Sequence, residues 1–74
     1  INPAGYTTTS IALMDALLAT EVPVIEVHIT NIHRRDELYQ KSLVSLAATG
    51  VICGFGAFGY ELAIRALHEQ LQAT

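Results

Sequence analysis

The segment 22–30 restricts what this chain can fold into more than any other feature. It reads VPVIEVHIT, a composition rich in β-branched residues with Pro23 near its start, and such a run is typical of a strand that carries the proline at its entrance. A second apolar run, Val51–Cys53, predicts another strand. Apolar residues at helical spacing predict one helix that ends near Thr20 and another from about Phe58 to Leu71.

The order of these elements predicts an α/β fold. Ile1 reads as the last residue of an apolar strand, and Asn2–Gly5 reads as the turn that follows it. A strand end, a helix, a strand, a connector, a strand and a helix then succeed one another, which is the pattern of a doubly wound parallel sheet with right-handed crossovers. The last helix is expected to pack against that sheet through four side chains on one face: Tyr60, Ile64, Leu67 and Leu71.

A parallel sheet with two whole strands is incomplete. Such a sheet needs both faces covered, and it leaves apolar edges open. We therefore interpret residues 1–74 as part of a single domain whose amino-terminal half is absent, and we expect partner subunits or the absent residues to complete the sheet.

Charge and hydropathy limit the classes of function. With 4 Lys and Arg against 7 Asp and Glu, the chain has a formal net charge of −3 and no basic block, which argues against nucleic-acid binding. The hydrophobic share of 51% excludes intrinsic disorder, yet the apolar runs are far shorter than the roughly 20 residues that cross a bilayer. No signal peptide is evident, and the single cysteine, Cys53, cannot form an internal disulfide. We expect a cytoplasmic protein without membrane or nucleic-acid partners.

Three polar side chains alternate along the first predicted strand. Glu26, His28 and Thr30 share one of its faces, near the carboxyl end where open α/β sheets bind ligands. Burying a carboxylate and an imidazole is costly unless they pair or serve a function. One interpretation is a general acid or base in which the carboxylate orients the histidine; the other is a structural pair within the core. The spacing alone favours neither.

A glycine motif and a possible metal site are weaker candidates. Gly54–Gly59 matches G-x-G-x-x-G between a strand and a helix, but the acidic residue that a dinucleotide site needs about 20 residues later is missing. We therefore favour a tight strand-to-helix turn and keep a nucleotide-binding module as the alternative. Glu26, His28 and His33 lack the spacing of a specific zinc motif, so we expect no metal.

Three stretches of the sequence resemble type II 3-dehydroquinate dehydratase. They are NPAGYTTTSIALMDAL at residues 2–17, PVIEVHITNIH at residues 23–33 and GVICGFG at residues 50–56, and the block Ile25–Asn31 is close to a signature of that family. The resemblance implies a flavodoxin-like domain longer than this chain, assembled as trimers into dodecamers. This chain then corresponds to the carboxyl-terminal half of the domain.

The resemblance also implies an activity. The family is a lyase that dehydrates 3-dehydroquinate to 3-dehydroshikimate by anti elimination through an enol or enolate, with neither a metal nor an organic cofactor. The reaction serves the shikimate pathway of aromatic amino acid biosynthesis or quinate catabolism. By position, His28 matches the general acid and Glu26 the carboxylate that supports it. Asn2 matches a residue that binds substrate and orients a water near the enolate oxygen.

Four more positions match residues that bind the substrate in this family. Ile29 and Thr30 fall where main-chain and hydroxyl donors hold the substrate carboxylate. Asp15 matches an acidic residue that reaches an active site across the trimer interface. Arg35 matches an arginine that follows the strand.

Two further substrate positions depart from the family pattern. Thr8 stands where a histidine is usual, and Tyr39 stands where an arginine is usual, so an imidazole donor and a charge-assisted contact are lost. The family's base is a tyrosine activated by an arginine in the absent half, and neither Tyr6 nor Tyr60 matches its motif. We therefore expect no activity from the 74 residues alone. A catalytically impaired homologue or an assembly subunit is the alternative function.

Overall fold

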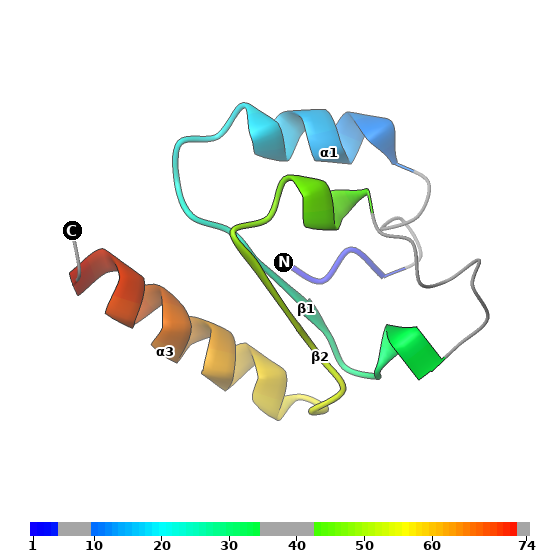
Figure 1. Cartoon of the computed structure of the whole chain (residues 1–74), viewed down its shortest axis with the longest axis vertical. Helices are drawn as coiled ribbons and strands as arrows, with labels where there is room; N and C mark the ends of the chain where they lie inside the picture. The colour runs from blue at the N-terminus through cyan, green and yellow to red at the C-terminus, as the bar shows by residue number, and fades with distance from the viewer. Residues whose placement is uncertain (5–9, 35–42, 73–74) are drawn as a thin grey trace.

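The computed structural model describes residues 1–4, 10–34 and 43–72 (Figure 1). In chain order its elements are α1 (Ile11–Leu18), β1 (Ile25–His28), the short 3-10 helices η2 (Ile32–Arg34) and η3 (Val44–Leu46), β2 (Gly50–Cys53) and α3 (Phe58–Gln72). The two strands pair in parallel, which confirms the predicted α/β class. No helix among these residues is both long and apolar enough to cross a membrane.

The backbone of Ile1 lies along the edge of β1 that β2 does not use. Its nitrogen donates a hydrogen bond to the Ile25 carbonyl at 2.9 Å, and the Val27 amide donates to the Ile1 carbonyl at 2.7 Å. These two bonds reach the residues on either side of Glu26, which is the hydrogen-bond pattern of neighbouring parallel strands. The prediction that Ile1 occupies a strand position is therefore confirmed, and β1 is bonded along both edges.

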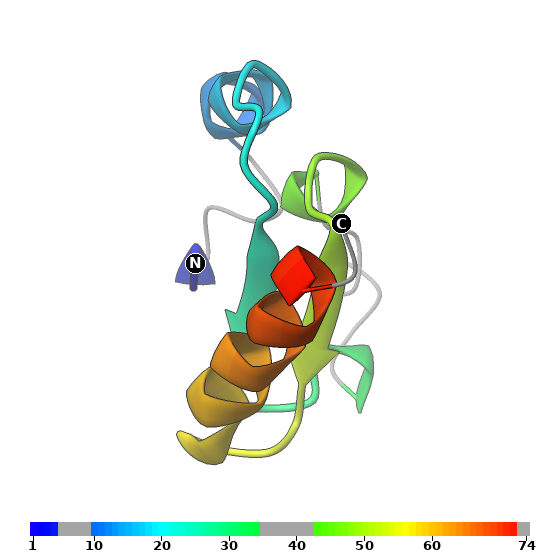
Figure 2. The same ribbon diagram turned by 90° about the vertical axis from the view of Figure 1, so that its left-hand side faces the viewer.

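One face of the sheet packs against α3. Ile25 and Val27 form the buried core with Ala63 of α3, and Ile52 and Leu67 add partly buried surface. Figure 2 shows α3 crossing this face of the two strands, whereas α1 lies apart from α3 and packs chiefly against η3.

The face of α3 that meets the sheet differs from the predicted one. Leu67 packs against the core as expected, but Ile64 and Leu71 expose 68% and 62% of their surface, and Tyr60 is also exposed. Small side chains make the contact in their place, because Gly59 and Ala63 let the helix axis come close to the strands.

Side chains alternate across β1, so the strand has one apolar and one polar face. Ile25 and Val27 point toward α3, while Glu26 and His28 point to the opposite side, where η3 lies. All four residues are buried. The strand therefore meets packed structure on both faces, as the sequence predicts for a parallel sheet.

Each glycine of the G-x-G-x-x-G motif has a structural role. Gly54 and Gly56 adopt φ angles of 94° and 60°, and their amides donate to the carbonyls of His28 and Ile29 at 3.2 and 2.9 Å. Such positive φ values are readily accessible to glycine only. A Cβ on Gly59 would lie 3.1 Å from Val27 Cγ1. The motif thus makes a tight turn and a close contact between helix and sheet.

The close contact at Gly59 yields a stability prediction. Gly59→Leu forces several extra carbons between α3 and Val27, where a single Cβ is already crowded, and should lower the free energy of unfolding by about 1–3 kcal/mol. Ala66→Leu is the matched control, because Ala66 lies on the same helix and is exposed. Urea denaturation of the intact protein measures both variants. Equal stability of the two would contradict this packing role of Gly59.

Candidate active site

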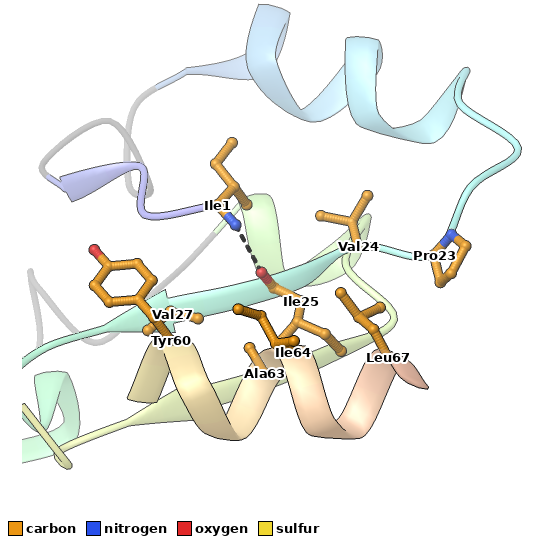
Figure 3. Close-up of a pocket in the computed structure, with 9 residues that line it drawn as sticks. All are labelled: Ile1, Pro23, Val24, Ile25, Val27, Tyr60, Ala63, Ile64 and Leu67. Carbon is orange, nitrogen blue, oxygen red and sulfur yellow. Dashed lines mark hydrogen bonds between the residues drawn. The ribbon is translucent and has the colours of Figure 1, made fainter. Parts of the chain in front are cut away.

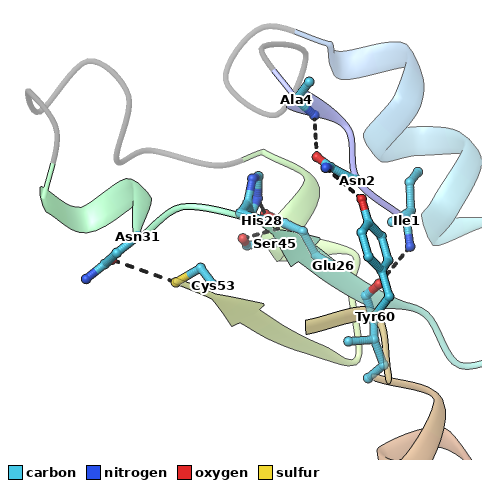
Figure 4. A network of polar contacts seen from close by, with 10 residues as sticks. Ile1, Asn2, Ala4, Glu26, His28, Asn31, Ser45, Cys53 and Tyr60 are labelled. Carbon is cyan, nitrogen blue, oxygen red and sulfur yellow. Dashed lines mark hydrogen bonds and ion pairs between the residues drawn. The ribbon is translucent and has the colours of Figure 1, made fainter. Parts of the chain in front are cut away.

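The buried polar face of β1 carries a hydrogen-bonded pair of a histidine and a carboxylate. The His28 side chain contacts Glu26 Oε2 through Nε2, and the two residues expose 5% and 0% of their surface (Figure 4). They lie two positions apart on the strand, so the backbone itself places them on one face. An ionised carboxylate only accepts hydrogen bonds, so the proton between the two groups is carried by His28 Nε2.

A second element holds the other oxygen of the carboxylate. The Ser45 hydroxyl, on η3, donates to Glu26 Oε1 at 2.9 Å. Among the described residues, no side-chain nitrogen or oxygen atom that is itself shut off from solvent lacks a hydrogen-bond partner. Both oxygens of Glu26 are therefore held in place, one from its own strand and one from the connector between the strands.

This arrangement allows proton transfer from one side of the imidazole. The bond at Nε2 fixes the orientation of the ring. Nδ1 of His28 forms no hydrogen bond with the described part of the chain, so this nitrogen is the position that can donate to a bound molecule. The geometry thus meets the requirements of a general acid oriented by a carboxylate.

Asn2 lies in a different group of polar contacts. Its Nδ2 donates to the Tyr60 hydroxyl at 2.9 Å, and its Oδ1 accepts from the Ala4 amide at 3.1 Å. Figure 4 shows this contact beside Ile1, apart from the pair of Glu26 and His28. The structure therefore does not bring Asn2 into hydrogen-bond contact with that pair.

Of the other predicted site residues that the structure describes, two lie next to His28 and one lies on α1. Ile29 and Thr30 directly follow β1 and are exposed next to His28. Asp15 is exposed on α1. Three positions lie outside the described residues: Thr8, Arg35 and Tyr39.

Two residues at this end of the sheet were not anticipated from the sequence. Ser45 is one, because nothing in the connector marks one serine as the partner of Glu26. The other is Asn31, whose Oδ1 accepts from the His33 amide at 3.0 Å and lies 3.9 Å from the Cys53 sulfur. Asn31 thereby links the end of β1 to the end of β2.

No metal centre is formed by the residues that the structure describes. Among them, no group of three or more His, Cys, Asp and Glu side chains is arranged to hold an ion. Glu26 and His28 bond each other, and His33 is exposed on η2.

Comparisons with known proteins agree with this geometry. The model of the family described as dehydroquinase class II matches residues 1–68. The 3-dehydroquinate dehydratase of Aliarcobacter butzleri is 56% identical over 71 residues, covering 96% of this chain and 43% of that protein. The 3-dehydroquinate dehydratase of Stutzerimonas stutzeri is 55% identical over 74 residues, covering 100% of this chain and 50% of that protein.

Two solved structures share the fold. The type II dehydroquinase from Propionibacterium acnes matches with a TM-score of 0.87 and 49% identity, over 90% of this chain and 49% of that chain. The enzyme of the same type from Butyrivibrio crossotus matches with a TM-score of 0.89 and 40% identity, over 92% of this chain and 48% of that chain. The chain thus spans about half the length of the relatives it matches. On the agreement of family model, relatives and fold, the chain belongs to the class II dehydroquinase family.

Proposed function

We propose that the protein carrying this chain is a 3-dehydroquinate dehydratase, a hydro-lyase that converts 3-dehydroquinate to 3-dehydroshikimate and water. The observation that carries the proposal is the buried His28, held at Nε2 by the Glu26 carboxylate. Relatives with this activity in their names support the choice of substrate. Because the chain spans about half their length, the activity is proposed for the whole protein.

The pair supplies the proton of the elimination step. A base removes the proton next to the ketone of the substrate, and the electrons form an enolate. Protonated His28 then gives its Nδ1 proton to the hydroxyl group, which leaves as water while the enolate collapses to the conjugated enone. Glu26 stabilises the positive charge of the imidazolium before this transfer and holds the ring in place throughout. The reaction needs no metal or organic cofactor.

Substrate contacts come from the end of β1 and from the segments around it. Ile29 and Thr30 are exposed beside His28, where their donors can hold the substrate carboxylate. Asn2 binds substrate and orients a water at the enolate oxygen, a role in which its amide exchanges the Tyr60 hydroxyl for the ligand. Asp15 reaches an active site of a neighbouring subunit. We propose that Arg35 also binds the substrate. Thr8 and Tyr39 occupy two further substrate-binding positions, at which the residue type departs from the family pattern.

We infer that residues 1–74 form the carboxyl-terminal half of a flavodoxin-like domain. A hollow lined by nine residues, among them Val24, Ile64 and Leu67, lies between β1 and α3 on the side of Ile1 (Figure 3). Its lining is mainly apolar, so packing by another segment is favourable. The other half of the domain is the proposed occupant.

The assembly, location and pathway belong to the same proposal. Helix α1 has an apolar sequence, IALMDALL, and no buried residue, so it offers surface for the contacts of a trimer-based dodecamer. Cys53 is a free thiol, as is usual in the reducing cytoplasm. The reaction fits either aromatic biosynthesis or quinate breakdown.

No observation favours the alternative functions. The substitutions that motivate an impaired homologue or an assembly subunit, Thr8 and Tyr39, lie outside the described residues. The glycines that motivate a nucleotide-binding module are accounted for by the turn and by the contact of α3 with Val27.

Replacing the general acid tests the proposed activity. In the intact protein, His28→Ala should lower kcat by a factor of about 100 to 10,000, because the departing hydroxyl loses its proton donor. The measurement is the growth of enone absorbance from 3-dehydroquinate. His68→Ala is the matched control, since that histidine is exposed on α3, and it should leave the rate unchanged. An intact wild-type protein that forms no enone would refute the activity, and unchanged turnover in His28→Ala would refute the role of His28.

The half-domain proposal predicts how residues 1–74 behave alone. Ile64, Leu71 and Phe55 expose 68%, 62% and 63% of their surface, and the buried core is small. The isolated chain should therefore self-associate and unfold without a cooperative transition. Circular dichroism on heating, combined with sedimentation velocity, measures this. A sharp transition of a monomer would contradict the proposal.

A further inference from the structure

We propose that Ser45 is a positioning residue for the acid of the reaction: by donating to Glu26 Oε1, it holds the carboxylate in the orientation that aligns His28. This inference rests on the proposed function. Its geometric basis is the 2.9 Å bond between Ser45 Oγ and Glu26 Oε1, on the oxygen opposite the one that His28 contacts.

The bond at Oε2 does not by itself set the plane of the carboxylate. The last side-chain torsion of a glutamate is broad and has no sharp staggered minima, so each further bond to the carboxylate narrows its range. The ring of His28 would follow a rotation about that torsion, since Nε2 stays bonded to Oε2. A second bond, at Oε1, fixes the plane of the carboxylate and with it the direction of the imidazole.

The hydroxyl also takes the place of water at the carboxylate. Glu26 is fully buried, so water does not solvate it. A hydrogen bond donated to one of its oxygens replaces part of that lost solvation.

Ser45 lies on a connector that is hydrogen-bonded to the residue before β1. Val44 is completely buried, and its carbonyl accepts from the amides of Ala47 and Ala48, both at 3.0 Å. At the end of the connector, the Thr49 amide donates to the Val24 carbonyl at 2.7 Å, and the Val24 amide donates to Thr49 Oγ1 at 3.1 Å. The connector is thus bonded to the residue that precedes β1.

Two variants of equal shape test the role of the hydroxyl in the intact protein. Ser45→Thr keeps the hydroxyl, and Ser45→Val replaces it with a methyl group of the same size. We expect Ser45→Val to lower kcat about tenfold relative to Ser45→Thr, equivalent to about 1.4 kcal/mol in the barrier, with KM changed by less than about twofold. Thr20→Val is the control for loss of a hydroxyl bond elsewhere, because Thr20 is exposed and its Oγ1 accepts from the nearby Val22 amide, and it should leave kcat unchanged.

The His28→Ala background separates positioning from general stability. If Ser45 acts through His28, replacing threonine by valine at position 45 should have no effect on kcat once the imidazole is gone. An equal loss in both backgrounds, or equal kcat for the two variants with His28 present, would overturn the proposal.

A spectroscopic readout keeps the test independent of activity. Nitrogen-15 NMR of the labelled intact protein reports the hydrogen bonding of the two His28 ring nitrogens. Their chemical shifts should differ from wild type in Ser45→Val and match wild type in Ser45→Thr. Identical spectra of the two variants would overturn the positioning role. A wild-type protein without dehydration activity would instead refute the proposed function, while the spectra still decide whether Ser45 orients the pair.

Discussion

The carboxylate of Glu26, buried in the middle of β1, is the constraint on which the rest of the structure depends. Removing a charge from water costs several kcal/mol unless partners replace the solvent. The chain supplies them at both oxygens, from His28 on the same strand and from Ser45 on η3. Because side chains alternate, shifting β1 by one residue would direct Glu26 toward α3 and Val27 toward Ser45. The pair therefore fixes which face of the strand each layer covers.

The apolar face of β1 imposes a second constraint, which is close packing against α3. Helix α3 must approach Ile25 and Val27 closely, and it does so through Gly59 and Ala63. Larger side chains on the helix then project beside the strand instead of onto it, which leaves Ile64 largely exposed. The same close packing accounts for a glycine motif that resembles a nucleotide fingerprint.

Local patterns in the sequence predict the elements well and their bounds less well. The helix predicted over residues 58–71 spans Phe58–Gln72, and Val51–Cys53 lies within β2. The strand predicted over residues 22–30 is confined to Ile25–His28, because β2 offers only four residues for pairing. The length of a strand is set by its partner, and a partner far away in the sequence leaves no mark on the strand's own composition.

In the site, too, local patterns are predictable from the sequence, and contacts between distant residues are not. Alternation within one strand predicts that Glu26, His28 and Thr30 share a face. The structure confirms this for Glu26 and His28, whereas Thr30 lies beyond the end of β1. The bond from Ser45 joins residues 19 positions apart, and that from Asn2 to Tyr60 joins residues 58 positions apart. Such contacts arise from packing between elements, and hydrophobic spacing does not encode them.

The proposed chemistry sets a requirement on where the acid and the base stand. In an anti elimination, the proton and the hydroxyl leave from opposite faces of the substrate, so acid and base must stand on opposite sides of it. The polar face of β1 is one side of the sheet, and this face supplies His28 with its support. The proposal therefore places the base on a segment that faces the substrate from the other side. A domain built in two halves meets this requirement when each half contributes one of the two groups.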